Sequence, residues 1–127
     1  MKALRCHAFG PVGHLALEED VASPVPSPQQ AVVTVRAAGV NFPDTLIVQG
    51  KYQIKPELPF TPGAEFAGVI KAIGEGVANV KPGDSVFGVG VTGGFAEETF
   101  SFTPLWMTLS VLTRKSRKLQ RGLTRKP

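Results

Sequence analysis

The sequence predicts a mainly β domain, a small and partly open β-barrel with one or two short helices, followed by a basic C-terminal tail. Three observations lead to this class. The 14 Gly and 11 Pro are scattered without a period, which is typical of many short strands and turns. About seven strand-like runs occur, and only one stretch has the signals of a helix. At 127 residues, the chain is long enough for one domain and too short for two full-sized ones.

The strand-like runs are apolar segments bounded by turn residues. In AVVTVRAAGVN, Val33, Val35 and Ala37 alternate with Thr34 and Arg36, the period-two pattern of a strand with one buried face. The proline-rich stretch ASPVPSPQQ before it cannot donate regular ladder hydrogen bonds and is expected to cross between elements. The segments that we expect to form strands are residues 1–9, 15–20, 31–41, 64–74 and 94–100, with turns at 10–14 and within 75–90.

One helix and one tight turn have local signals of their own. The segment FPDTLIVQG is compatible with a short helix, because Pro43 suits a first helical position and Asp44 favours the positive end of the helix dipole. Gly50 is placed to end it. Further along, Pro82 and Gly83 suit the two central positions of a type II turn, the glycine supplying the positive φ.

Charge divides the chain into two parts. Residues 1–100 hold seven Lys and Arg against all ten acidic residues, a net charge of −3, whereas residues 101–127 hold seven Lys and Arg and no acid, a net charge of +7. We therefore expect a domain over 1–100 and a basic tail over 101–127. The apolar start of the tail is compatible with a strand or a helix, and we expect disorder for the rest. Nucleic-acid or anionic-membrane binding by the tail is not favoured, because its two aromatic residues lie outside the basic cluster.

The cysteine content and the distribution of apolar residues limit the class of protein further. Cys6 is the single cysteine, so no intrachain disulfide and no cysteine-rich metal cage can form. Arg5 and His7 interrupt the N-terminus where an export signal needs an apolar core, and no apolar run is long enough to span a bilayer. A cytoplasmic location without membrane contact is the expectation.

Three segments together resemble a known family. AAGVNFPDTLIVQGKY, LPFTPGAEFAGVIKAIGEGV and VKPGDSVFG, in this order and spacing, resemble the N-terminal, GroES-like catalytic domain of medium-chain dehydrogenases/reductases. Within that superfamily the match is to the zinc-free quinone oxidoreductases (zeta-crystallin-like) and enoyl reductases. The resemblance covers about four-fifths of the chain and implies a GroES-like fold for residues 1–100.

The resemblance also bears on metal binding. In the zinc alcohol dehydrogenases, which look similar, a cysteine stands at the place of Asn41 and a histidine at the place of Ala64. A catalytic zinc needs about three protein ligands. Asn41 and Ala64 are poor or impossible zinc ligands, so Glu65 has no further ligands beside it. No metal site is therefore expected. His7 and His14 fall in the first hairpin, where a surface or core role is favoured over metal binding.

In the zinc-free relatives, NADPH or NADH gives a hydride to a quinone or to the β-carbon of an α,β-unsaturated carbonyl, and the protein supplies orientation and electrostatics. The resemblance places Asn41 at the cleft, where its amide would position the nicotinamide or polarise a carbonyl. Tyr52 would offer a hydroxyl to the developing oxyanion and a ring to the substrate. Both are the expected catalytic and cofactor-binding residues. The alternatives are a strand-end residue that satisfies a turn, for Asn41, and an amphipathic cover over the barrel, for Tyr52.

Three further residues are expected to support the substrate cleft: Phe42, Asp44 and Glu65. Asp44 is expected mainly as a charge at the helix start. Glu65 is interpreted as a buried carboxylate that braces the cleft, with a structural role as well supported as a functional one.

The motif GVGVTG, residues 88–93, fits G-x-G-x-x-G letter for letter. The dinucleotide fingerprint needs a helix directly after it, because the pyrophosphate rests on the helix N-terminus. Residues 95–100 are instead expected as a strand, and no acid lies in the tail. Gly93 and Gly94 are therefore interpreted as hairpin glycines.

The family would continue with a doubly wound nucleotide-binding domain of well over a hundred residues. Here a basic segment of 27 residues follows that does not align with it, which suggests truncation with an unrelated end, or an isoform-specific tail. We therefore expect no tight cofactor binding and negligible reductase activity from this chain alone. The alternative, from another class, is a non-catalytic GroES-like interaction module with exposed apolar surface.

Overall fold

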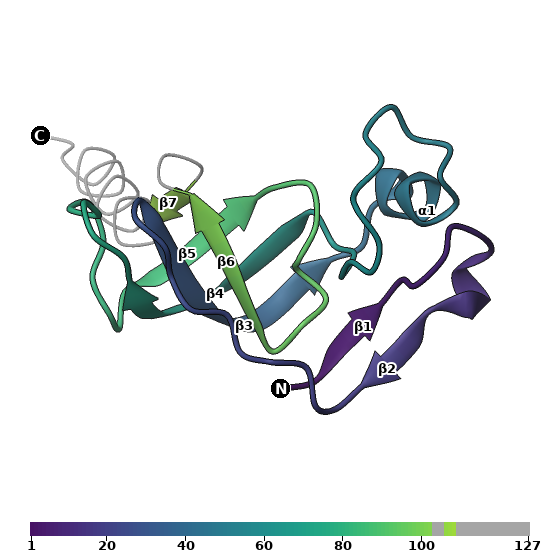
Figure 1. Cartoon of the computed structure of the whole chain (residues 1–127). Coiled ribbons are helices and arrows are strands. Elements are labelled where there is room, and N and C mark those ends of the chain that lie inside the picture. Colours follow the sequence, from purple (N-terminus) through teal and green to yellow (C-terminus); the bar gives the residue numbers. More distant parts are fainter. Residues whose placement is uncertain (103–105, 109–127) are drawn as a thin grey trace, which may run out of the picture.

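The computed structural model describes residues 1–102 and 106–108 (Figure 1). These residues hold seven short strands, one α-helix and one 3-10 turn. The elements are β1 (Ala3–Arg5), η1 (Val12–His14), β2 (Ala16–Glu18), β3 (Gln30–Gly39), α1 (Phe42–Val48), β4 (Glu65–Ile73), β5 (Ser85–Val89), β6 (Glu98–Phe102) and β7 (Trp106–Thr108). No helix in this part of the chain is long and apolar enough to cross a bilayer.

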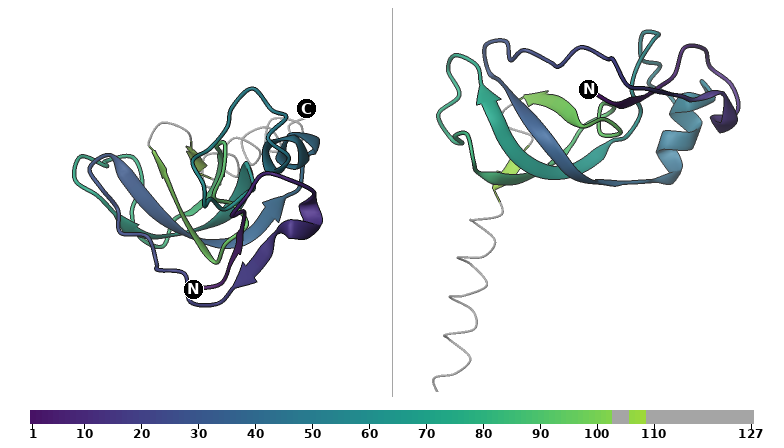
Figure 2. Two further views of the ribbon diagram at one scale, coloured as in Figure 1. Left: turned by 45° about the vertical axis from the view of Figure 1, so that its right-hand side comes forward. Right: turned by 90° about the horizontal axis from the view of Figure 1, so that it is seen from below.

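The strands form two antiparallel sheets. β1 and β2 make a separate hairpin, and the other five strands follow the order β6-β3-β4-β5-β7. β6 and β7 are thus the two edges of the larger sheet, although only three residues separate them in the chain. Three linking residues span at most about 14 Å between the flanking Cα atoms. The sheet must therefore curl until its edges approach each other, and Figure 2 shows it bent in this way. This confirms the mainly β, partly open barrel.

The long strand β3 is an interior strand of the larger sheet. It pairs with β4 on one side and β6 on the other, and two register shifts against β4 bend it. The alternation expected for this strand was wrong as a guide to burial, because Val32 and Val33 are both buried at its start and Ala37 is exposed towards its end. Burial of each valine side chain contributes about 1.5–3 kcal/mol. The core inside the curl consists of Ala31, Val33, Phe66, Ile70, Val77, Val80 and Val86.

A second, smaller core attaches α1 to the hairpin. It consists of Cys6, Ile47, Val48 and Phe60. The backbones of Cys6 and Phe60 exchange two hydrogen bonds, of 2.8 and 3.1 Å. Together with the bridge between Ala3 and Ala96, these bonds connect the hairpin to the rest of the fold.

The helix and the turn that had local signals form as expected. Pro43 lies in the first turn of α1, and Gly50, just past its end, has a φ of 68°. Gly83 has a φ of 92°, and the Asp84 N–H donates to the Lys81 carbonyl at 3.1 Å, which closes the turn around Pro82.

The glycines after β5 behave differently from the expectation. β5 pairs with β4 and β7, and β6 pairs with β3, so the loop between β5 and β6 is not a hairpin and the assignment of Gly93 and Gly94 as hairpin glycines was wrong. The loop is instead bonded to the segment before β4, where Gly93 donates to Thr61 and Gly94 to Gly63. A strand, and not a helix, follows the GVGVTG motif, as expected.

The proposed division of the chain at residue 100 stays a prediction. β6 runs through Phe102, and β7 pairs with β5. All seven cations of the basic tail lie outside the described residues, so its expected disorder does too.

The Cys6 thiol leads to a prediction on pH. Its side chain is 1% exposed, and this burial raises the pKa of the thiol above its ordinary value. Because the pKa of the thiol is higher in the folded protein than in the unfolded chain, the neutral thiol contributes fully to stability at pH values below its ordinary pKa of about 8.5. This contribution is lost as the pH rises towards the pKa of the folded state. We expect the free energy of unfolding to fall as the pH rises above about 8.5, by at most about 1.4 kcal/mol per pH unit.

Urea denaturation of the wild type and of Cys6→Ala at several pH values checks this expectation. The variant is expected to be less stable at neutral pH but to lack this alkaline slope. Equal slopes in the two proteins would assign the pH dependence to other groups.

Candidate functional site

Asn41 lies where β3 gives way to α1. It is half-buried and has an extended backbone conformation, with φ −123° and ψ 157°, as a helix-capping residue should. Glu65 is close by, at the start of the neighbouring strand β4. A Cβ placed on Gly39 would come within 3.0 Å of the Glu65 Oε2 and 3.7 Å of the Asn41 Nδ2. The absence of a side chain at Gly39 thus leaves space between the carboxylate and the amide.

Asp44 holds this corner together. It is 3% exposed, its Oδ2 accepts the Asn41 N–H at 2.7 Å, and its Oδ1 accepts the Ala64 N–H at 3.1 Å. The first bond satisfies a free N–H at the helix start, as expected for a charge at this position. The second joins the helix to the residue that precedes β4, twenty positions away. Sequence reasoning missed this second bond, which has no local signal.

Glu65 and Phe42 differ from Asp44 in burial. The interpretation of Glu65 as a buried carboxylate was wrong, because the residue is exposed. It begins β4 opposite Gly39, near the open end of the sheet. Asp44 is the buried carboxylate of this corner instead. Phe42 is 74% exposed, at the first position of the short helix. The expected role of all three in supporting a cleft stays a prediction.

Tyr52 packs near the other end of the helix. It is half-buried and lies against the small core formed by Cys6, Ile47, Val48 and Phe60. Asn41 caps the first turn, whereas Ile47 and Val48 come from the last turn of a helix about 10 Å long. No described contact joins Asn41 to Tyr52. That Asn41 and Tyr52 act together in one cleft stays a prediction. In this prediction, the length of α1 determines the distance between the two side chains.

The sheet end beside Asn41 is open and apolar. Val40 is 76% exposed and Val89 50% exposed. Gly39, Glu65 and Val89 lie side by side on β3, β4 and β5. A shallow groove of about 560 Å³ runs over this end, lined by Ala37, Ala38, Gly39, Glu65, Phe66, Ala67, Phe87, Gly88 and Val89.

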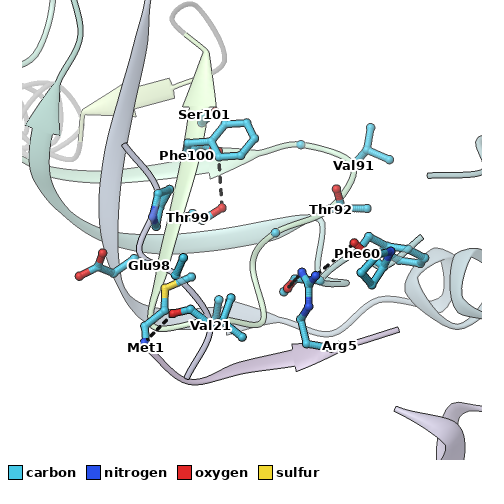
Figure 3. Close-up of a pocket in the computed structure, with 17 residues that line it drawn as sticks. Met1, Arg5, Val21, Phe60, Val91, Thr92, Glu98, Thr99, Phe100 and Ser101 are labelled. Atoms are coloured by element: carbon cyan, nitrogen blue, oxygen red, sulfur yellow. Dashed lines mark hydrogen bonds between the residues drawn. The ribbon is translucent and has the colours of Figure 1, made fainter. Parts of the chain in front are cut away.

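A second groove, of about 550 Å³, lies beside β6, and neither groove has Asn41 or Tyr52 in its lining. Figure 3 shows Arg5 and Phe60 on one side of it and Glu98 on the other. It is therefore separate from the corner around Asn41.

The described residues offer no metal centre, since no three His, Cys, Asp or Glu side chains among them converge. Ala64 has no donor side chain. His7 is exposed and lies 2.5 Å from the Glu18 carboxylate, a pairing within the first hairpin. His14 lies in η1 of the same hairpin.

In the described part of the chain, the curled sheet and the one capped helix are typical of a GroES-like domain. The family model for the alcohol dehydrogenase GroES-like domain matches residues 27–103. The chain belongs to this family and, with it, to the medium-chain dehydrogenase/reductase superfamily, as an N-terminal domain of the quinone oxidoreductase kind.

The individual relatives agree with this assignment. The quinone oxidoreductase of Lama guanicoe is 48% identical over 98 residues, which are 76% of this chain and 30% of the relative. A probable oxidoreductase from Mycobacterium abscessus matches 85% of this chain and 34% of its own at 40% identity, with a TM-score of 0.78. The Escherichia coli quinone oxidoreductase complexed with NADPH matches 85% of this chain and 33% of its own at 28% identity, with a TM-score of 0.79. The chain thus spans about a third of the length of these proteins.

Proposed function

We propose that the described domain is the substrate-side half of a zinc-independent, NAD(P)H-dependent reductase of quinones or α,β-unsaturated carbonyls. One observation carries the proposal: the backbone of Asn41 is held in place by the buried Asp44, and the residue lies at the open apolar end of the sheet. The relationship to quinone oxidoreductases, one of them complexed with NADPH, supports this reading. We propose the cytoplasm as its compartment and NADPH as its cofactor.

The residues at this corner fit a nicotinamide. When bound, the cofactor supplies the hydride. The Asn41 amide carries two donors and one acceptor oxygen, which complement the carboxamide of a nicotinamide ring. The space left by Gly39 lets a flat ring approach the strand. Val40 and Val89 offer an apolar rim that excludes water once a second surface covers it.

Tyr52 is proposed to act on the substrate. Its ring is anchored by the small core, so its position is determined by the end of α1. From there, its hydroxyl would donate to the carbonyl oxygen as negative charge develops on it. Asp44 acts on neither ligand in this proposal. It is a positioning residue, which fixes the backbone that carries Asn41.

We propose zinc-independence because of the side chains that could serve as metal ligands. The residue beside Glu65 is Ala64, and the described residues do not bring three metal-ligating side chains together. A catalytic zinc needs about three such ligands.

A chimera tests the proposed function. Residues 1–102 replace the corresponding part of the Escherichia coli quinone oxidoreductase, and NADPH oxidation is followed with 1,4-naphthoquinone. We expect kcat/KM within about tenfold of the parent enzyme, since a tenfold change corresponds to only about 1.4 kcal/mol of the barrier. Dialysis against EDTA is expected to leave the rate unchanged.

Two outcomes would contradict the proposal. A folded chimera that binds NADPH but does not reduce the quinone would show that this domain lacks the catalytic corner. A rate lost in EDTA and restored by zinc would refute zinc-independence alone.

A further inference from the structure

The Glu65 carboxylate lies close to the Asn41 amide at the open end of the sheet. Glu65 is the first residue of β4 and is paired with Gly39 of β3 on one side and with Val89 of β5 on the other. A Cβ added to Gly39 would lie 3.0 Å from the Glu65 Oε2 and 3.7 Å from the Asn41 Nδ2. The two atoms therefore border the same space, and they are closer together than the Debye length of about 8 Å at physiological ionic strength.

No cation neutralises this carboxylate in the described part of the chain. Glu65 is exposed, and its side chain has neither a hydrogen bond nor an ion pair with any described residue. Arg36, the one cation of β3, lines a different groove, next to the β1–β2 hairpin. Asp44, the buried carboxylate of the same corner, accepts from two backbone N–H groups, which are neutral. The corner around Asn41 thus has a negative charge that the described residues do not balance.

This charge affects the affinity of whatever binds beside the Asn41 amide. A like charge on a ligand is disfavoured there, and an opposite charge is favoured. The oxidised nicotinamide ring carries a positive charge, whereas the reduced ring is neutral. Glu65 therefore discriminates between the two forms of the cofactor. Because the carboxylate is exposed to water, we expect about a threefold change in affinity for each unit of ligand charge.

We propose that Glu65 selects the ligands of this corner by charge. It favours the positively charged, oxidised nicotinamide ring over the neutral, reduced ring, and it disfavours ligands that carry an acid group. The substrates that it admits are accordingly uncharged quinones and enones, and not those with a carboxylate or a sulfonate. This inference rests on the proposed function, since it takes the nicotinamide and the substrate to bind beside Asn41.

A titration of the whole 127-residue chain, labelled with nitrogen-15, tests the proposal. The probes are 1-methylnicotinamide, nicotinamide and nicotinate, which share one aromatic ring and are a cation, a neutral molecule and an anion. We expect weak, saturable shifts of the Gly39 and Asn41 amide signals. Affinity is expected to fall about threefold from 1-methylnicotinamide to nicotinamide, and about threefold again to nicotinate. Salt at about 0.5 M should reduce these differences in the wild type.

Three variants separate the effect of charge from the other differences between the probes. Glu65→Gln removes the charge and keeps the shape of the side chain, so the ratio of the affinities for 1-methylnicotinamide and nicotinate is expected to fall by about tenfold. Glu65→Asp keeps the charge and is expected to keep most of the ratio. Glu75→Gln is the matched control, because it removes the same charge from an exposed residue beyond the other end of β4, and it should leave the ratio unchanged.

The contrary results are distinct from one another. Binding of all three probes with the same ratio in Glu65→Gln as in the wild type would refute the role of Glu65 and leave the proposed function standing. A loss in Glu75→Gln as large as that in Glu65→Gln would assign the selectivity to the total charge of the domain and overturn the inference. Absence of a saturable shift with every probe would refute the inference together with the placement of the nicotinamide beside Asn41, whereas quinone reduction by the chimera tests the proposed function independently.

Discussion

The polypeptide of residues 1–127, assayed alone, is expected to oxidise NADPH in the presence of 1,4-naphthoquinone no faster than the uncatalysed background. In the proposed site, Asn41 and Tyr52 supply only part of the contacts that a nicotinamide and a quinone need. Holding the nicotinamide and the quinone in attack geometry is worth on the order of 7–11 kcal/mol, a factor of about 10⁵ to 10⁸ in rate. The G-x-G-x-x-G motif does not supply a pyrophosphate site, because in the described residues the strand β6 follows it where a helix would be needed.

The Escherichia coli quinone oxidoreductase, assayed at the same concentration, is the positive control. Turnover by the 127-residue polypeptide that saturates with both NADPH and quinone, and that disappears in Asn41→Ala, would contradict the expectation. Such a result would mean that the domain holds the cofactor unaided.

Replacing Asp44 by alanine is expected to lower the free energy of unfolding by about 2–4 kcal/mol. Asp44 is 3% exposed and accepts from two backbone N–H groups, those of Asn41 and Ala64. Without the carboxylate, both N–H groups lose a charged acceptor, and the start of α1 is no longer joined to the start of β4. Urea denaturation followed by circular dichroism measures the loss.

Two variants serve as controls for this prediction. Asp44→Asn keeps one acceptor oxygen and is expected to lose less stability than Asp44→Ala. Asp84→Ala removes another carboxylate that accepts from a backbone N–H, that of Lys81, but in an exposed turn, and its effect is expected to be smaller. If Asp44→Ala cost no more than Asp84→Ala, the buried link between helix and sheet would carry no stability.

The fold was predictable where its signals are local. The β-branched run identifies β3 as a strand, Pro43 and Gly50 mark the start and end of α1, and Gly83 supplies the conformation of its turn. In each case the signal lies within a few residues of the element that it determines, so residue propensity is sufficient.

Other features depend on contacts between distant parts of the chain. The bond from Ala64 to Asp44 crosses twenty positions, and nothing in the sequence near Asp44 indicates it. Glu65 was expected to be buried because it follows a Pro-Gly pair, but its place opposite Gly39 at the sheet end leaves it exposed. Gly93 and Gly94 look like hairpin glycines only if consecutive strands are taken as neighbours, which the strand order excludes.

The candidate site also has one part that the sequence predicted and one part that only the structure shows. Asn41 and Tyr52 were selected through the resemblance to a family, and the structure adds what holds each of them: Asp44 for the first and the small core around Cys6 for the second. The groove beside β6 had no signal in the sequence, because residues that line it, such as Arg5 and Ser101, are more than ninety positions apart.

The central claim is that the Asn41 amide works on the nicotinamide or the carbonyl, and the most direct test is kcat/KM for NADPH-dependent quinone reduction by the chimera carrying Asn41→Ser. Serine retains the preference for the helix-capping position but has no amide, so the fold is preserved. The account predicts a loss of about 100-fold, comparable to the removal of one preorganised donor in an active site. A folded Asn41→Ser chimera with unchanged kcat/KM would contradict it.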